Sequence, residues 1–322
     1  MKFRDEGGPF HPVATVDDIF NCFRLILGRL PNRCEWGPHS ARAGEQLDDV
    51  VASYFNSVEF SNRLLMRRTG NFASLVSLDG FALYASPEDA AVGRHIIATG
   101  TYEPNVSEVF RRTVKPGMHV LDVGANIGFY TMLGASLVGP KGKVWAVEPN
   151  PDNVRMILAS RAKNRFEHVA VIQGAAGETW ETMCIFPDAS NATVTRVSAA
   201  EPSQFPPTVL SLPLDVLLGE NRVDVIKIDV EGSEGCSLRG ALQVLRRDRP
   251  TIFCEFTPEA LPSISKMTAE QFLQFLTDLD YDLTVLLDDS GECGQDIAKV
   301  MSYYEQSHLG HLDLLARPRI PS

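Results

Sequence analysis

A glycine-containing loop occupies the stretch Asp122-Val-Gly-Ala-Asn-Ile-Gly-Phe-Tyr-Thr131. We expect residues 118–123 to form a strand and residues 127–138 a helix, so the loop joins the end of a strand to the start of a helix. In open parallel sheets, ligands bind at the carboxyl ends of strands, and the first N–H groups of a helix attract anions. The loop is therefore a candidate ligand site.

The spacing of its glycines narrows the choice of ligand. Gly124 and Gly128 form a GxxxG pattern, and Asn126 stands where a dinucleotide-binding loop has the glycine that admits a pyrophosphate. No Gly-Lys-Ser/Thr follows, which excludes a phosphate-binding P-loop. The smaller carboxylate tail of S-adenosylmethionine suits this loop better, and an NAD-dependent oxidoreductase is disfavoured.

A second ligand contact is expected at Glu148, the last residue of the strand predicted for 143–148. A carboxylate at this place can accept hydrogen bonds from both hydroxyls of a ribose, in adenosylmethionine as in NAD. Alternatively, Glu148 caps the helix that begins at Pro149-Asn-Pro-Asp152.

Further carboxylates follow two later strands, predicted for 223–229 and 251–256. Asp229 and Glu231 end the first of these, and Glu255 ends the second. A hydroxyl is a poor nucleophile, so a positioned base would help a methyl transfer to oxygen. Alternatively, Glu231 caps a helix and Glu255 forms a salt bridge.

Lys227, within a buried strand, should pair with Asp122 or Asp229. Because spacing offers no third ligand and no HExxH pattern, we expect no metal.

Together, the segments Asp122–Thr131, Glu148–Pro151 and Ile226–Glu234 make the chain resemble the FkbM family of methyltransferases over about residues 74–318. That family consists mostly of O-methyltransferases acting on natural products and sugars. The resemblance implies that Asp229 faces the transferred methyl group and is the first candidate for the base, followed by Glu231 and Glu255. It also implies a set of cofactor contacts: Tyr102, Glu103, Asp122, Gly124, Asn126, Gly128, Glu148, Ala175 and Ala176.

The order of elements predicts an α/β fold, with a doubly wound, mostly parallel, seven-stranded, Rossmann-like methyltransferase sheet. Two strand predictions, 282–287 and 311–316, have no clear helix between them and can pair antiparallel. Residues 178–215 interrupt the alternation of strands and helices with two extra strand-like runs and a Pro/Ser-rich segment, which we interpret as an insertion or lid. The other predicted strands are 118–123, 143–148, 168–173, 223–229 and 251–256, and the helices between and after them are 127–138, 151–164, 234–246 and 268–279.

A small all-helical module is expected before this sheet, so we divide the chain into 1–70 and a methyltransferase domain at 71–322. Apolar residues recur at helical spacing from Val16 to Leu30, then a loop follows Pro31, and further stripes cover 47–55 and 60–65. A hairpin around Asp79-Gly80 and a short helix at 87–98 begin the second domain. The module resembles one found in bacterial proteins of surface-glycan and secreted-protein assembly.

Composition limits the possible partners. The formal net charge is −11 and the pI about 5.1, which disfavours nucleic acids and anionic membranes. We expect no signal peptide and no membrane span, because no apolar stretch is long enough. Six scattered cysteines without a CxxC pattern fit a reduced cytoplasm.

These observations predict an enzyme that transfers a methyl group from S-adenosylmethionine to a hydroxyl, on a sugar or glycan precursor. Two alternatives remain open. One is an O-methyltransferase of a polyketide or other small metabolite. The other is a non-catalytic binding or assembly protein that retains the fold. The oligomeric state is not predicted.

Overall fold

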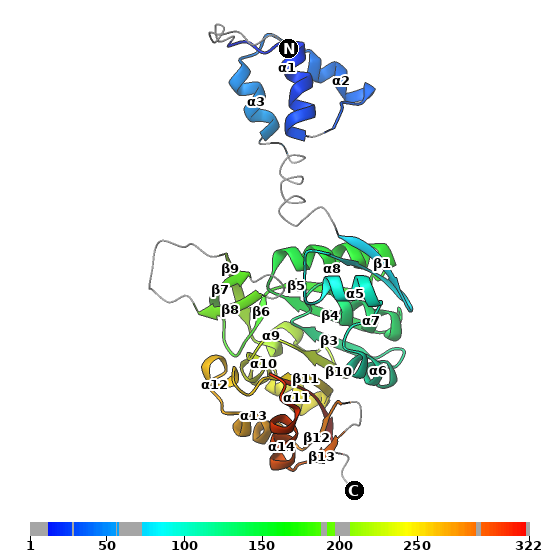
Figure 1. Cartoon of the computed structure of the whole chain (residues 1–322), viewed down its shortest axis with the longest axis vertical. Helices are drawn as coiled ribbons and strands as arrows, with labels where there is room; N and C mark the ends of the chain where they lie inside the picture. Colours follow the sequence, from blue (N-terminus) through cyan, green and yellow to red (C-terminus); the bar gives the residue numbers. More distant parts are fainter. Residues whose placement is uncertain are drawn as a thin grey trace. The chain divides into compact units, whose positions relative to one another are not determined.

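The structure is a computed structural model that describes residues 12–27, 29–55, 57, 73–187, 192–196, 207–287 and 291–319. The chain divides into two compact units, Met1–Asn71 and Phe72–Ser322 (Figure 1). Among the helices in these ranges, none is long and apolar enough to cross a membrane.

The first unit is helical where it is described. Its core contains Ile19, Phe23, Val50 and Tyr54, all buried. The expected loop after Pro31 is wrong, because residues 33–40 form a helix. Asn32 and Glu35 cap its start reciprocally, which satisfies N–H groups that would otherwise lack partners. The stripe predicted at 60–65 lies outside the described residues. The helices are α1 (Val16–Asn21), a π-helical turn (Cys22–Leu27), α2 (Arg33–Ser40) and α3 (Leu47–Phe55).

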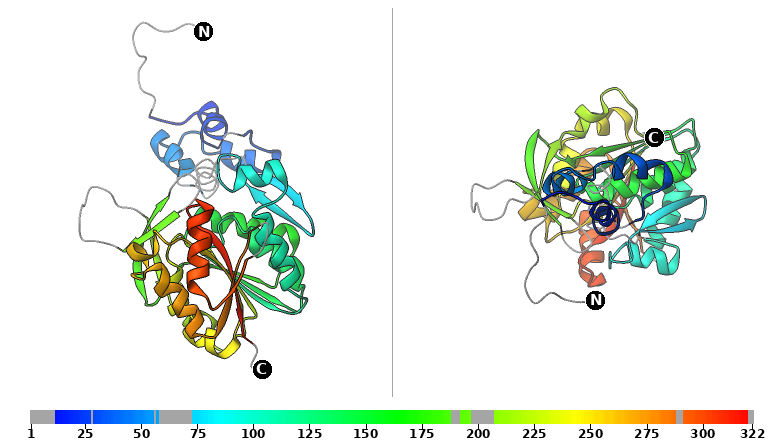
Figure 2. Two further views of the ribbon diagram at one scale, coloured as in Figure 1. Left: turned by 60° about the horizontal axis from the view of Figure 1, so that its bottom comes forward. Right: turned by 90° about the horizontal axis from the view of Figure 1, so that it is seen from above.

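The second unit is built on one large, mostly parallel sheet. Its strand order is β13-β12-β14-β11-β10-β3-β4-β5, and helices lie on both of its sides (Figure 2). The predicted doubly wound sheet is confirmed, with an eighth strand, β13, at one edge. The strands are β3 (His119–Val123), β4 (Lys143–Glu148), β5 (Val169–Gln173), β10 (Val225–Ile228), β11 (Thr251–Phe256), β12 (Tyr281–Val285), β13 (Gly291–Gly294) and β14 (Leu312–Pro318).

The sheet reverses its direction of winding between β3 and β10. The chain runs outward from β3 through β4 to β5, then returns to place β10 on the other side of β3, parallel to it. This reversal separates the crossover connections and leaves a crevice at the carboxyl ends of the two strands. The principal helices here are α7 (Phe129–Val138), α8 (Pro151–Asn164), α10 (Glu234–Arg239), α11 (Leu242–Asp248) and α13 (Ala269–Asp278).

Alternating residues along the strands face two separate cores. In β3, Leu121 packs with one buried cluster and Val120 with the other. Because side chains alternate, the even-numbered residues of β3 and the odd-numbered residues of β10 and β11 face the same side. Polar residues near the strand ends can therefore meet on one face of the sheet.

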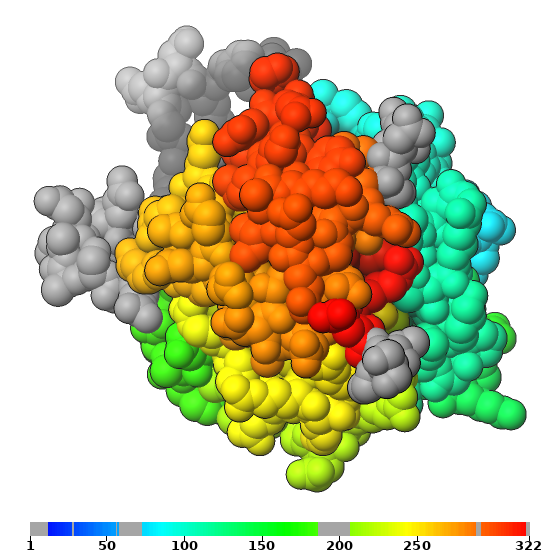
Figure 3. All heavy atoms as spheres, turned by 90° about the horizontal axis from the view of Figure 1, so that it is seen from below, coloured from blue at the N-terminus to red at the C-terminus, as the bar shows by residue number. Residues whose placement is uncertain are grey.

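Two helices were not expected from the sequence. Helix α14 (Ile297–Ser307) lies between β12 and β14, where no helix was expected, although these strands do pair antiparallel as predicted. Helices α13 and α14 lie on the outer surface of the half of the sheet that contains β12, β13 and β14 (Figure 3). Helix α6 (Pro104–Thr113) was not predicted either; it begins with Pro104, whose fixed φ suits a first helical position.

The hairpin predicted around Gly80 is confirmed as β1 (Ser74–Leu78) and β2 (Phe81–Ala85), and the helix expected at 87–98 is shorter, as α5 (Gly93–Thr99). The insertion predicted at 178–215 contributes three strands rather than two to a small second sheet, which also includes β6 (Ala175–Ala176); most of its Pro/Ser-rich segment lies outside the described residues. The other strands of this sheet are β7 (Glu181–Pro187), β8 (Ala192–Arg196) and β9 (Thr208–Leu212), in the order β6-β9-β7-β8.

Candidate functional site

A cavity of about 1020 Å³ lies at the carboxyl ends of β3, β4, β10 and β11. Residues of the small sheet, including Glu181 and Met183, form part of its wall. Every site residue predicted from sequence lines this cavity except Gly128. The topological reversal between β3 and β10 therefore coincides with the predicted residues.

The glycine loop is shaped by contacts with neighbouring elements. Gly124 has φ +76°, and a Cβ added there would lie 1.8 Å from the backbone oxygen of Asp229. A side chain at Gly124 would therefore displace the backbone at the end of β10. Gly128 has φ +93° and faces Ile157 of α8, so it lies outside the cavity lining. These two glycines permit close packing of backbone around the site.

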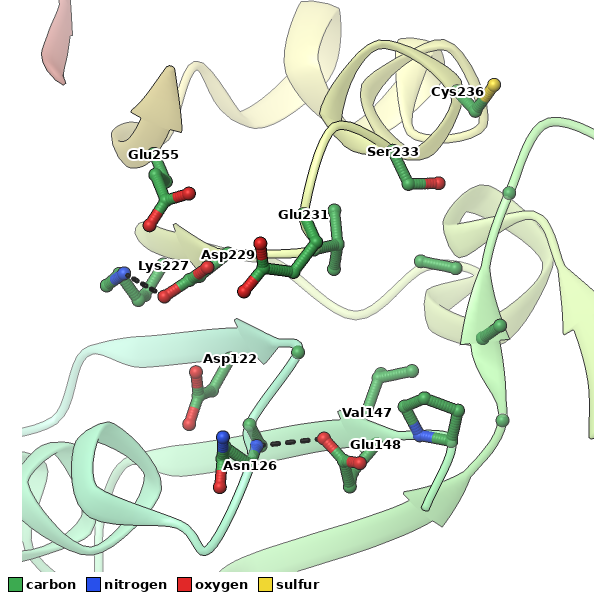
Figure 4. Close-up of a pocket in the computed structure, with 18 of the residues that line it drawn as sticks. Asp122, Asn126, Val147, Glu148, Lys227, Asp229, Glu231, Ser233, Cys236 and Glu255 are labelled. Carbon is green, nitrogen blue, oxygen red and sulfur yellow. Dashed lines mark hydrogen bonds and ion pairs between the residues drawn. The ribbon is translucent and has the colours of Figure 1, made fainter. Parts of the chain in front are cut away.

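Glu148 connects this loop to the start of α8. Its Oε2 accepts a hydrogen bond from the Asn126 N–H at 2.8 Å, and its Oε1 accepts one from the Asn150 N–H at 2.8 Å. Figure 4 shows Asn126 and Glu148 together on one side of the cavity. Burial raises the pKa of Glu148 to about 7, against the lowering effect of these hydrogen bonds. Glu148 thus braces the next helix while still lining the cavity, so the two roles considered from sequence are compatible.

Asp122 lies at the base of the cavity and is 2% exposed. Its Oδ2 accepts a hydrogen bond from the Thr131 hydroxyl at 2.5 Å, which ties β3 to α7. Burial raises the pKa of Asp122 to about 6. The expected pairing of Asp122 with Lys227 is not among the ion pairs of the described residues.

Tyr102 and Glu103 reach the cavity from the loop before α6. Glu103 adopts a left-handed backbone with φ +44°, and its Oε2 accepts a hydrogen bond from the Tyr130 hydroxyl at 2.8 Å. The ring of Tyr102 packs edge-on against Phe129, with 5.6 Å between centroids. Two segments distant in sequence therefore share one wall of the cavity.

Lys227 lies within β10 and is buried, as expected for a lysine with a partner. Its Nζ lies 3.3 Å from Asp229 Oδ2 and 3.7 Å from Glu103 Oε2. The ammonium also lies 5.0 Å from the centroid of the Tyr130 ring. The partnership with Asp229 is confirmed, and the contact with Glu103 is one that sequence reasoning missed.

Three carboxylates gather on the opposite side of the cavity from Glu148. Figure 4 shows Asp229, Glu231 and Glu255 close together, with Lys227 beside them. Burial, followed by the charges of Asp229 and Glu231, raises the pKa of Glu255 to about 9. Burial and the charge of Asp229 also raise the pKa of Glu231. At neutral pH, Glu255 is therefore a protonated carboxyl that can donate a hydrogen bond.

Ala175 and Ala176 form β6, which pairs with β9 of the small sheet, and both line the cavity. Sequence reasoning missed other lining residues, among them Cys236 and Arg239 of α10. Arg239 forms an ion pair with Glu178 at 2.9 Å, which ties α10 to the small sheet. Within the described ranges, no three His, Cys, Asp or Glu side chains are grouped to hold a metal ion.

Residues 122–283 match the methyltransferase FkbM domain. The chain belongs to the FkbM methyltransferase family. The matched domain is that of S-adenosylmethionine-dependent methyltransferases, and S-adenosylmethionine is the cofactor.

Two curated relatives are similar to part of the chain. A protein-L-isoaspartate O-methyltransferase of Methanothrix thermoacetophila is 38% identical over 19% of the chain and 29% of its own length. A probable cobalt-precorrin-6B C(15)-methyltransferase (decarboxylating) of Sulfurisphaera tokodaii is 36% identical over 19% of the chain and 32% of its own length. The chain thus spans about a third of the length of these relatives.

Solved structures give more distant likenesses. The methyltransferase FkbM of Methylobacillus flagellatus KT is 15% identical, with a TM-score of 0.40 over 72% of this chain and 61% of that one. An O-methyltransferase from Bacillus cereus in complex with SAH is 14% identical, with a TM-score of 0.41 over 69% of this chain and 84% of that one.

The residues around the cavity fit the cofactor of this family. Each Glu148 oxygen accepts one backbone N–H, and a carboxylate oxygen has capacity for a further donor such as a ribose hydroxyl. The absence of a side chain at Gly124 keeps the loop against Asp229 and leaves backbone at the cavity wall. The acidic residues that line the cavity also suit the positive charge of a sulfonium.

Proposed function

We propose that this methyltransferase transfers the methyl group of S-adenosylmethionine to a hydroxyl group on a sugar or glycan precursor. The main support is the convergence of Asp229, Glu231 and Glu255 at the ends of two adjacent parallel strands. Carboxyl groups in this arrangement can accept the proton of a hydroxyl and orient the neighbouring hydroxyl groups of the same substrate.

The reaction requires an acceptor oxygen aligned with a methyl–sulfur bond. Bound S-adenosylmethionine supplies an electrophilic methyl group on a positively charged sulfur. As the acceptor's O–C bond forms, the S–C bond breaks, its electron pair stays on sulfur, and the hydroxyl proton passes to a carboxylate. S-adenosylhomocysteine and a methyl ether are the products. The protein contributes mainly by holding the acceptor in line.

We assign the proton-accepting role to Asp229. Its Oδ2 lies 3.3 Å from the buried ammonium of Lys227, which holds the carboxylate in place at the cavity wall. Glu255 is less suited to be the base at neutral pH, because its carboxyl is protonated. We propose instead that Glu255 donates a hydrogen bond to an oxygen of the substrate that is methylated. Glu231 accepts a hydrogen bond from the same substrate.

A polyhydroxyl acceptor fits these groups because it offers several donors and acceptors within a small volume. In the cavity lining, acidic residues outnumber basic ones, and Arg239 is already paired with Glu178. An anionic acceptor would add repulsion. The similarity of the N-terminal module to modules of surface-glycan proteins also supports a sugar. A polyketide or other small metabolite remains the alternative acceptor.

The test is methyl transfer by the full chain from S-adenosyl[methyl-³H]methionine to separate panels of neutral sugars, oligosaccharides and phenolic metabolites. We expect label in the sugar panel and a new O-methyl signal in the NMR spectrum of the product. Label confined to phenols would favour the metabolite alternative. Calorimetry addresses the non-catalytic alternative, since no binding of millimolar S-adenosylmethionine would exclude the enzyme.

A further inference from the structure

The loop that follows β10 has an unusual backbone. Glu231 has φ +53° and Gly232 has φ +92°, and the Ser233 N–H donates to the Val230 carbonyl at 3.1 Å. Two consecutive left-handed residues closed by this bond form a type I′ turn. A glutamate at the first left-handed position is strained, because its Cβ crowds the backbone. Such strain persists only where the surroundings enforce it.

The enforcing contacts come from Glu234, which is fully buried. Its Oε1 accepts hydrogen bonds from the N–H groups of Val230 at 3.1 Å and of Gly232 at 3.2 Å, on either side of Glu231. Its Oε2 has no hydrogen-bond partner within the described part of the chain. A buried carboxylate oxygen without a partner is costly, so this arrangement is not explained by stability alone.

A second contact holds the same turn from the opposite side. The buried hydroxyl of Ser265 donates to the Gly232 carbonyl at 2.6 Å. A Cβ at Gly232 would lie 2.5 Å from the Cβ of Ala260, so this position must remain glycine. The turn is thus confined by groups that do not themselves enter the cavity, whereas Glu231 does line it.

We propose that Glu234 is the positioning residue of the acceptor side, holding the Val230–Ser233 turn in the left-handed geometry that directs Glu231 into the cavity. This inference rests on the proposed function, because it assigns Glu231 to the acceptor. Glu234 acts through the backbone and touches neither substrate nor cofactor.

The first test compares two variants of one residue with a matched control. Glu234→Leu removes both hydrogen bonds, and we expect kcat/KM for the acceptor to fall roughly 10- to 100-fold, with Kd for S-adenosylmethionine nearly unchanged. Glu234→Gln retains an acceptor oxygen and should restore most of the activity. The control is Asp215→Leu, since Asp215 likewise accepts two backbone N–H bonds, from Gln243 and Val244, but lies outside the cavity lining. This variant should lose stability and keep wild-type kcat/KM.

Two further measurements need no acceptor. In Glu234→Leu, amide hydrogen exchange at Val230 and Gly232 should accelerate at least about tenfold, without a comparable change in β10. Glu231→Gly should raise Tm by about 2 to 4 °C, since glycine adopts φ +53° without strain. Unchanged exchange in Glu234→Leu, or a Glu234→Gln variant as impaired as Glu234→Leu, would overturn the proposal. If the wild-type chain methylates no hydroxyl, the proposed function fails, while hydrogen exchange in Glu234→Leu still decides whether Glu234 holds the turn.

Discussion

The Nζ of Lys227 lies 3.3 Å from the Oδ2 of Asp229, within a strand that is buried on both faces. Burial alone lowers the pKa of the Lys227 ammonium, but the carboxylates of Asp229 and Glu103 outweigh this effect and raise that pKa well above its usual range. The buried ammonium of Lys227 therefore links Asp229, the candidate base, to Glu103, one of the predicted cofactor contacts.

Removing the Lys227 ammonium should lower the free energy of unfolding. Lys227→Met leaves Asp229 and Glu103 without their buried partner, and we expect a loss of about 3 kcal/mol in the free energy of unfolding. In a double-mutant cycle with Asp229→Asn, urea unfolding should give a coupling energy above about 1 kcal/mol. The exposed pair Arg112 and Glu108 is the control, with coupling below about 0.5 kcal/mol. Equal coupling in both cycles would contradict a special role for Lys227.

Asp229→Asn should separate chemistry from cofactor binding. The amide preserves the size of the side chain but cannot take up the proton of the acceptor. We expect kcat to fall at least about 100-fold, while Kd for S-adenosylmethionine changes only a few-fold. Asp282→Asn, at a position outside the cavity lining, is the control and should leave both unchanged. Similar losses in kcat and in cofactor affinity would remove Asp229 as the base.

Gly124→Ala tests whether the loop depends on close packing against β10. The new Cβ would meet the Asp229 carbonyl at 1.8 Å, so we expect a loss of about 2 to 4 kcal/mol together with weaker cofactor binding and slower turnover. Gly139→Ala is a matched control, because Gly139 also has a positive φ, +64°, but has open space around its Cβ. It should cost about 1 to 3 kcal/mol through backbone strain alone, because Gly139 has ψ −174°, and leave activity intact. An active Gly124→Ala enzyme with wild-type affinity would contradict this account.

The stability of the ligand-free protein should fall as pH rises. Folding raises the pKa of Glu148 to about 7 and that of Glu255 to about 9, from 4.5. Between pH 4.5 and 9 the folded state therefore binds more protons than the unfolded state, and the free energy of unfolding decreases with pH. Glu35, whose pKa is lowered to about 2 by its hydrogen bond with Arg29, affects stability only below this window.

Urea titrations at pH 5, 6.5 and 8 measure this trend. The Glu255→Gln variant, which cannot ionise, should show a shallower decline than the wild type. Stability that rises from pH 5 to pH 8 would show that these carboxyl groups are better hydrated than the structure indicates.

The charge of the methyl acceptor should affect its KM. A neutral sugar should have a lower KM than the same sugar bearing a carboxylate or phosphate, because Asp229 and Glu231 repel anions. Glu231→Gln should narrow this difference by reducing the KM for the anionic acceptor. A wild-type preference for the anionic sugar would argue for a different orientation of substrate in the cavity.

Much of the site follows from local patterns in the sequence. The strand ending at Asp122, the glycine loop after it and the carboxylates after β4, β10 and β11 are all predictable, because strand alternation and turn chemistry are local properties. Parallel pairing then brings the strand ends to one edge of the sheet. The family's cofactor was therefore evident, and the position of the candidate site could be predicted, before any tertiary contact was known.

Tertiary structure decided how these groups act on one another. The contact between Lys227 and Glu103 depends on the packing of α6 and α7 on one face of the sheet, and no local pattern specifies it. The close approach of Gly124 to the Asp229 backbone depends on the register of β3 and β10, which places the two residues together. The protonated state of Glu255 likewise arises from burial beside Asp229 and Glu231, because pKa values depend on surroundings assembled from distant parts of the chain.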